Sequence, residues 1–328
     1  MPFKYRKVYL APYNDISKEV EQYLNQYKIQ VIAYIDKYKT GGNIIHPENI
    51  KNEYDYIFVY SPVYMYEITY VLPKQNLYVV TQLLNEYFFI HYKDIQIRDN
   101  YIQNLKNKHV NNRAFVIANG PSLTLNDIEK IRNEITFAAN KIWLMFNQTQ
   151  WRPRYYVVVD KLMMEQNYLE IEAVESKNKL YADFLMTSTQ KPLKNGIYFK
   201  TDMNATHFDM NKGIYTGPTV VYSMISMAIY MGIKEIYLIG LDHSFIIPKQ
   251  YKEYQEENKI IISQGEKNHF HKDYIKVGEK VAQPEIESLD EAFHKIHLLA
   301  KDKGVKIFNA SRQSKLNEFE FVNLDEVI

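Results

Sequence analysis

The chain has 328 residues, of which 46% are hydrophobic and 24% charged, so it is long enough for two domains and is not a disordered protein. Its 40 basic and 39 acidic residues leave a net charge of +1, which argues against nucleic-acid binding through bulk charge. The sequence has no cysteine, and this excludes disulfides, thiol nucleophiles and metal sites built on thiolates.

Neither a secretory signal nor a membrane span is predicted. The first residues contain no apolar run of the length that a signal peptide needs. The most apolar stretch, residues 219–233, is shorter than the roughly 20 residues of a membrane span and is followed at once by Lys234 and Glu235. We therefore predict a buried helix there and a cytoplasmic protein. Peripheral association with the inner face of the membrane stays open, although no basic amphipathic helix indicates it, and so does homo-oligomerisation.

The first 95 residues alternate between strand-like and helix-like patterns. Four strands are predicted, at residues 7–11, 30–35, 54–60 and 77–80. Apolar residues spaced for one helical face predict a helix over 15–27, so this region is expected to be a small Rossmann-like domain with a parallel sheet. The first turn, residues 11–14, has no glycine that would let a pyrophosphate approach the backbone. A structural or partner-binding domain is therefore preferred to a dinucleotide site.

A second α/β domain is predicted over residues 113–328, after a linker at 96–112 that is rich in Asn and Lys. Five of its predicted strands end close to a polar residue, namely Asn119, Asn140, Asp160, Asp242 and Asn309. Ligands of open parallel sheets bind outside the carboxyl ends of the strands, so these side chains are expected to converge on one crevice. The alternative is that Asn and Asp are simply common in turns, which explains any one of them better than all five.

Two turns between a strand and a helix carry residues suited to an anion. Gly120 and Ser122 lie in the run Asn119-Gly120-Pro121-Ser122, where glycine allows close backbone approach and serine can cap a helix or bind a phosphate. Thr216 and Gly217 open the long apolar helix in the same style. Together the turns predict a phosphate-bearing ligand, with ordinary helix caps as the alternative.

The polar, aromatic-bearing stretch from residue 246 to 286 is predicted to be a loop or lid between a strand and a helix. It contains His269 and His271, and a histidine in such a loop can act as a general base near neutral pH. The sequence has no HExxH, Walker A or GxSxG motif. Asp160 and Asp242 would hold Mg²⁺ only if they converge.

The order of these motifs resembles a known group of enzymes. The runs at 116–123 (VIANGPSL), 213–245 and 268–270 (NHF), with Asn140 after the first, are similar to bacterial sialyltransferases of glycosyltransferase family 42. They are also similar to the motility accessory factors and to the archaeal 6-hydroxymethylpterin pyrophosphokinases. The resemblance covers about Arg113 to the C-terminus. It implies a Rossmann-like glycosyltransferase domain, a CMP-sugar donor, a glycan or glycolipid acceptor, and no metal or other cofactor.

The same resemblance implies roles for individual residues. The positions implied in donor binding are Asn119, Gly120, Ser122, Asn140, Asp160, Thr216, Gly217, Asp242, His243 and Ser244. His269 falls on the proposed general base, although His271 is close enough to be confused with it. Tyr251 is the nearest candidate for one of two lid tyrosines that hold the departing phosphate, and Ser244 stands near the place of the other.

One donor-site position departs from the family pattern. Asp160 stands where those sialyltransferases have Asn. A carboxylate there would repel a phosphate, but it suits a ribose hydroxyl or a metal ion. This departure leaves the identity of the sugar open.

These observations predict a transferase that moves sialic acid or another CMP-activated keto-sugar to a bacterial surface glycan, with His269 as the base. Two alternatives remain. One is a pyrophosphokinase-like phosphotransferase that uses ATP and Mg²⁺, with Asp160 and Asp242 as metal ligands. The other is a non-catalytic binding protein of a surface-glycan pathway, in which the N-terminal domain is a docking module.

Overall fold

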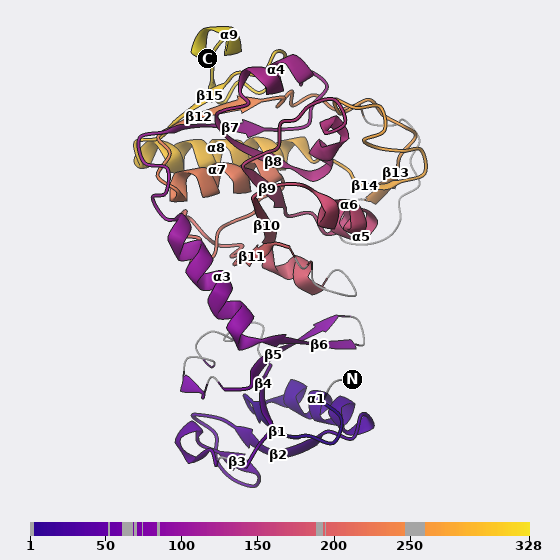
Figure 1. The fold of residues 1–328 in the computed structure, drawn as a ribbon, viewed down its shortest axis with the longest axis vertical. Coiled ribbons are helices and arrows are strands. Elements are labelled where there is room, and N and C mark those ends of the chain that lie inside the picture. The colour runs from indigo at the N-terminus through magenta and orange to yellow at the C-terminus, as the bar shows by residue number, and fades with distance from the viewer. Residues whose placement is uncertain are drawn as a thin grey trace. The chain divides into compact units, whose positions relative to one another are not determined.

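The chain forms two α/β units. The computed structural model describes residues 3–51, 53–60, 68, 71–73, 75–83, 86–187, 193, 195–246 and 260–328. It divides the chain into Met1–Asp99 and Asn100–Ile328, each with its own sheet (Figure 1). The predicted fold class, α/β with Rossmann-like sheets, is confirmed. Helix α3 (Tyr92–Leu105) crosses the division and covers most of the residues that were expected to be a linker.

The first unit is built on a sheet with the strand order β3-β2-β1-β4-β5-β6. Its strands are β1 (Lys7–Ala11), β2 (Gln30–Ile35), β3 (Ile44–Ile45), β4 (Tyr56–Val59), β5 (Leu77–Leu83) and β6 (Glu86–His91). Neighbouring strands pair in parallel from β3 to β5, and β6 adds an antiparallel edge. Helix α1 (Asp15–Gln26) contacts β1 and β2, and a short 3-10 helix, η1 (Pro47–Asn49), follows β3. The sequence analysis did not predict β3 or β6.

In such a unit a dinucleotide would bind the N-terminus of the first helix and the acidic residue after the second strand. Here both groups are hydrogen-bonded to neighbouring residues of the chain. Asn14 caps α1 by accepting a hydrogen bond from the Ser17 amide at 2.9 Å, and the Ser17 hydroxyl accepts one from the Asn14 amide at 3.2 Å. Asp36, which follows β2, accepts amide hydrogen bonds from Tyr38 at 2.8 Å and Lys39 at 2.9 Å. The helix N-terminus and the acidic residue therefore already have backbone partners.

The second unit is built on an all-parallel sheet with the order β11-β10-β9-β8-β7-β12-β15-β16. Its strands are β7 (Arg113–Ile117), β8 (Ile135–Ala139), β9 (Tyr155–Val158), β10 (Asn178–Ala182), β11 (Ile197–Phe199), β12 (Glu235–Ile239), β15 (Lys306–Asn309) and β16 (Glu320–Phe321). A separate antiparallel pair consists of β13 (Ile260–Ile262) and β14 (Lys280–Ala282). The strand order reverses between β7 and β12, and such a switch point is where a parallel sheet leaves a crevice for ligands.

Helices cover both faces of this sheet. They are α4 (Leu125–Lys130), α5 (Lys161–Gln166), α6 (Tyr168–Ala173), α7 (Val220–Tyr230), α8 (Ile286–Asp302) and α9 (Leu324–Val327), with the 3-10 helices η2 (Asn140–Met145) and η3 (Asp183–Thr187). Helices α7 and α8 pack side by side on one face, and α4 lies on the other (Figure 1). Helix α7 is buried along almost its whole length, as its apolar sequence predicted. Within the part of the chain that the structure describes, no helix combines the length and apolar character that a bilayer crossing requires.

Aromatic side chains tie the central strands together. Phe115, Tyr237 and Phe308 stack across β7, β12 and β15 with neighbouring ring centroids 5.2 Å apart. Phe137 of β8 stacks on Tyr155 of β9 at 4.7 Å, and both rings are fully buried. Apolar side chains on both faces are typical of parallel strands that helices cover on each side.

Truncation of Phe137 should destabilise the second unit strongly. Phe137→Ala removes a fully buried ring from the sheet core and should lower the free energy of unfolding by about 3–5 kcal/mol, as measured by urea denaturation. The matched control is Phe321→Ala on β16, where the side chain is 48% exposed and the change should stay within about 0.5 kcal/mol. Equal effects of the two variants would contradict the described core.

Candidate functional site

The carboxyl ends of β7 and β12 touch at the switch point. The Gly120 amide donates a hydrogen bond to the Gly240 carbonyl at 2.8 Å. A Cβ atom on Gly120 would lie 2.5 Å from that carbonyl oxygen and 2.8 Å from Cγ of Asp242, so no side chain fits there without displacing backbone. The glycine that the sequence analysis assigned to close ligand approach is therefore required by contact between the two strand ends.

Asp242 is held by Ser122 across this contact. The Ser122 amide donates to Oδ2 of Asp242 at 2.7 Å, and the Ser122 hydroxyl donates to Oδ1. Burial raises the pKa of the Asp242 carboxyl, and the hydrogen bonds from Ser122 act in the opposite direction. Ser122 does not cap the following helix as expected: α4 begins at Leu125, and Thr124 is its N-cap because it accepts a hydrogen bond from the Asp127 amide.

Three polar atoms near this crevice are buried without a hydrogen-bond partner among the described residues: Oδ1 of Asn119, Oδ1 of Asn140 and Nδ1 of His269. The amide nitrogen of Asn119 donates to the Ala139 carbonyl at 3.1 Å, and the side chain of Asn140 is hydrogen-bonded to Tyr274. Both side-chain NH₂ groups are therefore used, and both side-chain carbonyls are free. Buried polar atoms without partners are rare because each costs free energy, so the two carbonyl oxygens indicate a place for hydrogen-bond donors of a ligand.

His269 lies on the same edge of the sheet. The Phe270 amide donates to the Asn119 carbonyl at 3.0 Å, which attaches this segment to the turn after β7. The His269 ring stacks on Tyr274 with centroids 3.8 Å apart and planes within 3°. Burial, together with the positive charge of Lys141, lowers the pKa of His269 to about 4. The imidazole is therefore neutral at physiological pH and able to accept a proton.

A small cavity of about 160 Å³ brings predicted and unpredicted residues together. Its walls include Asn140, Asp160 and His269, which the sequence analysis selected. They also include Lys141 and Tyr274, which it missed, and Glu279, which forms an ion pair with Lys141. Lys141 directly follows Asn140, and Tyr274 lies three residues after His271. This closeness in sequence to selected residues was the only feature that could have identified them. No feature of the sequence could have identified Glu279, because its partner Lys141 lies far away in the chain.

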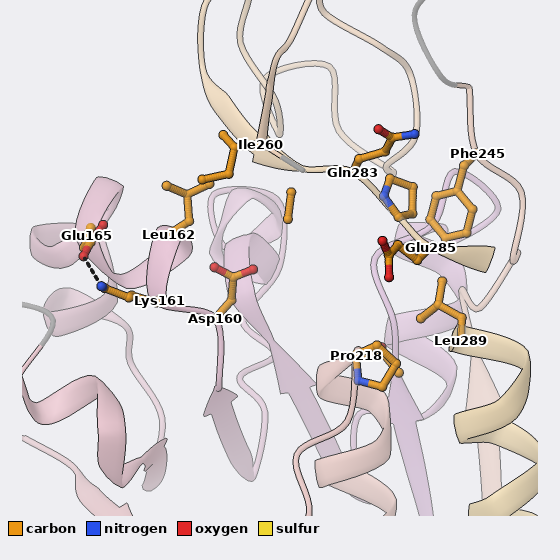
Figure 2. A pocket seen from close by; sticks show the side chains of 13 residues that line it. Asp160, Lys161, Leu162, Glu165, Pro218, Phe245, Ile260, Gln283, Glu285 and Leu289 are labelled. Carbon is orange, nitrogen blue, oxygen red and sulfur yellow. Dashed lines mark ion pairs between the residues drawn. The ribbon is translucent and has the colours of Figure 1, made fainter. Parts of the chain in front are cut away.

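A larger cavity of about 630 Å³ adjoins the small one, since Asp160 borders both. Figure 2 shows the Asp160 carboxylate directed into this cavity, while Lys161 turns away from it to Glu165 at 3.8 Å. Asp160 also caps α5 by accepting the Met163 amide at 2.7 Å, and burial raises its pKa. Other walls come from the start of α7 (Pro218 and Thr219), from Phe245 in the segment after β12, and from the chain around the start of α8 (Gln283, Glu285 and Leu289).

The remaining predicted residues have other surroundings. Thr216 is buried, and Thr219 rather than Thr216 caps α7, while Gly217 has a left-handed φ of +67° in the turn between them. Nε2 of His243 lies 2.7 Å from Oδ1 of Asp290. Ser244 is half-buried beside Phe245, and Nδ1 of His271 accepts a hydrogen bond from the Asp273 amide. The Asn309 side chain is hydrogen-bonded within its own turn, to Ser311 and Ser314. Tyr251 lies outside the described residues.

Asp160 and Asp242 do not converge. They follow β9 and β12, which are separated by β8 and β7, and three steps across the sheet correspond to about 14 Å at the usual spacing of strands. A single metal ion bound directly by both carboxylates is incompatible with this separation. Over the described ranges, no cluster of three or more His, Asp or Glu side chains suited to a metal ion is present.

The comparison with protein families agrees with the resemblance inferred from the motifs. Residues 86–248 match the model of a family described as 6-hydroxymethylpterin diphosphokinase MptE-like. The predicted relation to this group is confirmed over the matched residues, which run from β6 to just beyond β12 and make up just under half of the chain. Among curated proteins, a search finds none that matches the sequence.

Solved structures of similar architecture include glycosyltransferases. The MAf glycosyltransferase from Magnetospirillum magneticum AMB-1 aligns with a TM-score of 0.43 and 10% identity over 97% of this chain, which spans 57% of the length of that protein. The sialyltransferase CstII from Campylobacter jejuni, solved with cytidine-5'-monophosphate, aligns with a TM-score of 0.36 and 16% identity. That alignment covers 65% of this chain and 85% of CstII.

Loss of the Ser122 hydroxyl should weaken the contact between the strand ends. Ser122→Ala removes one of two hydrogen bonds to the buried Asp242 carboxylate and should lower the free energy of unfolding by about 1–3 kcal/mol. Ser244→Ala is the matched control, because Ser244 has no hydrogen bond to any residue in the described ranges, and it should change stability by less than about 0.5 kcal/mol. A Ser122→Ala variant as stable as the wild type would contradict the assigned role.

Proposed function

We propose that the chain is a glycosyltransferase that moves sialic acid or another CMP-activated keto-sugar from a CMP-sugar donor to a bacterial surface glycan. The observation that carries the proposal is a set of acceptors at the carboxyl edge of the sheet: the two free side-chain carbonyls, Oδ1 of Asn119 and Oδ1 of Asn140, and the carboxylate of Asp160, which is directed into the larger cavity. A ligand that satisfies them must present several hydrogen-bond donors. Sugar and ribose hydroxyls and the amino group of cytosine have this chemistry, and an ionised phosphate does not.

The reaction requires a base for the acceptor hydroxyl. In the proposed step the acceptor oxygen attacks the anomeric carbon of the donor, and the bond from that carbon to the phosphate oxygen breaks, so that CMP leaves. The proton of the acceptor hydroxyl passes to His269, whose lowered pKa leaves the ring neutral, and from there to solvent. Nδ1 of His269 is buried, so the other ring nitrogen, Nε2, is assigned to receive it.

The chain also supports the placement of the base. Asn268 makes two hydrogen bonds to the backbone of Ile246, at 2.7 Å and 2.9 Å, and so joins the segment after β12 to the His269 segment. The Phe270 amide holds the other side of His269 to the Asn119 turn. His269 is thus fixed between two anchored neighbours, which is the pre-organisation that a general base needs.

The second candidate is a phosphotransferase that uses ATP and Mg²⁺, and the match of residues 86–248 to a diphosphokinase-like family favours it. Asp160 alone would then hold the ion, together with phosphate oxygens and water, because Asp242 is too far away and is bound by Ser122. This candidate leaves the Asn119 and Asn140 acceptors without an assigned role, and we therefore rank it second.

Replacement of His269 should remove transfer without removing nucleotide binding. For His269→Ala we expect the release of CMP from a CMP-activated keto-sugar, in the presence of a glycan acceptor, to fall by about 10²–10⁴-fold, with CMP affinity unchanged. The matched control is His271→Ala, since His271 lies two residues away and does not border either cavity. Full turnover by His269→Ala would refute the assignment, and loss of turnover only in His271→Ala would move it to that histidine.

A further inference from the structure

A buried ion pair borders the small cavity and has no part in the proposed reaction. Nζ of Lys141, in η2, contacts Oε1 of Glu279, which immediately precedes β14. Their side chains are only 6% and 15% exposed. Such a pair contributes little net stability, because the cost of removing both charges from water offsets their attraction. Its place beside His269 therefore points to a role other than stability.

The ion pair continues into the aromatic stack that holds His269. Lys141 Nζ lies 5.9 Å from the centroid of the Tyr274 ring, close enough for a cation–π contact. Tyr274 is 3% exposed, and its ring packs flat against the imidazole of His269. The four side chains form one connected row from Glu279 through Lys141 and Tyr274 to His269.

We propose that the Lys141–Glu279 pair is a positioning device for His269: it fixes Tyr274 against the imidazole and places a positive charge that keeps the ring neutral before the reaction. Lys141 acts here through another residue and is not itself a catalytic residue. The proposal rests on the proposed function for the use of that proton, but the effect on His269 can be measured without turnover.

The charged groups around His269 support the role of Lys141 as a residue that acts through the histidine. The groups that line the same cavity are Lys141 from η2, Asp160 from the end of β9, Glu279 and Lys280 at the start of β14, and the Tyr274 hydroxyl. A carboxylate nearby would favour the protonated ring, whereas Lys141 and the loss of water disfavour it. Burial and Lys141 are the two causes that lower the pKa of His269. Removal of the lysine charge should therefore raise it.

The test is an NMR titration of the His269 imidazole in isotopically labelled full-length protein, with the signal assigned from His269→Ala. The variant is Lys141→Met/Glu279→Gln, which removes both charges and leaves no unpaired one buried. We expect the midpoint to rise from near pH 4 but to stay below the ordinary histidine value, because burial is the larger cause of the lowered pKa and remains in the variant. Lys161→Met is the matched control, because Lys161 borders the larger cavity but is 61% exposed, and it should leave the midpoint unchanged.

A conservative variant separates charge from packing. Lys141→Arg keeps the positive charge, so the His269 midpoint should stay near its wild-type value. An unchanged midpoint in Lys141→Met/Glu279→Gln, or a midpoint that moves equally in Lys161→Met, would overturn the proposal. A midpoint that moves as expected, with full transfer retained by His269→Ala, would support the positioning and overturn His269 as the base of the proposed function.

Discussion

The close contact of the carboxyl ends of β7 and β12 is the constraint on which the site depends. These strands become neighbours only because the sheet order reverses between them, and Gly120 against Gly240 leaves no room for a side chain. The same turn presents the Asn119 carbonyl to the Phe270 amide, so a segment about 150 residues later in the chain is placed beside it. The contact between Gly120 and Gly240 thus positions both the Asn119 turn and the segment that carries His269.

The electrostatics of this edge follow from burial more than from charge. Asp160 and Asp242 have a raised pKa and His269 a lowered one, in each case with desolvation as the largest cause. A neutral imidazole beside free side-chain carbonyls suits the binding of hydroxyl groups and the removal of a proton from one of them. This combination is what connects the geometry to the proposed sugar transfer.

Much of the second sheet could be predicted from sequence, because parallel strands buried on both faces appear as apolar runs and polar residues mark their ends. The start of α4 could also have been predicted, because Thr124 followed three residues later by Asp127 is a capping-box pattern. The Lys141–Glu279 ion pair could not be predicted from the sequence, since it joins residues 138 positions apart. Nor did the sequence indicate that Ser122 would bind Asp242, because that bond depends on which strands become neighbours.

Nucleotide binding tests the central claim most directly. The measurement is the thermal stability of the full chain with CMP and with ATP, each in Mg²⁺ and in EDTA. At about 100 times its dissociation constant, a ligand should stabilise the folded protein by roughly 2.7 kcal/mol. The account predicts stabilisation by CMP that persists in EDTA. Stabilisation by ATP alone, and only with Mg²⁺, would contradict it and favour the phosphotransferase.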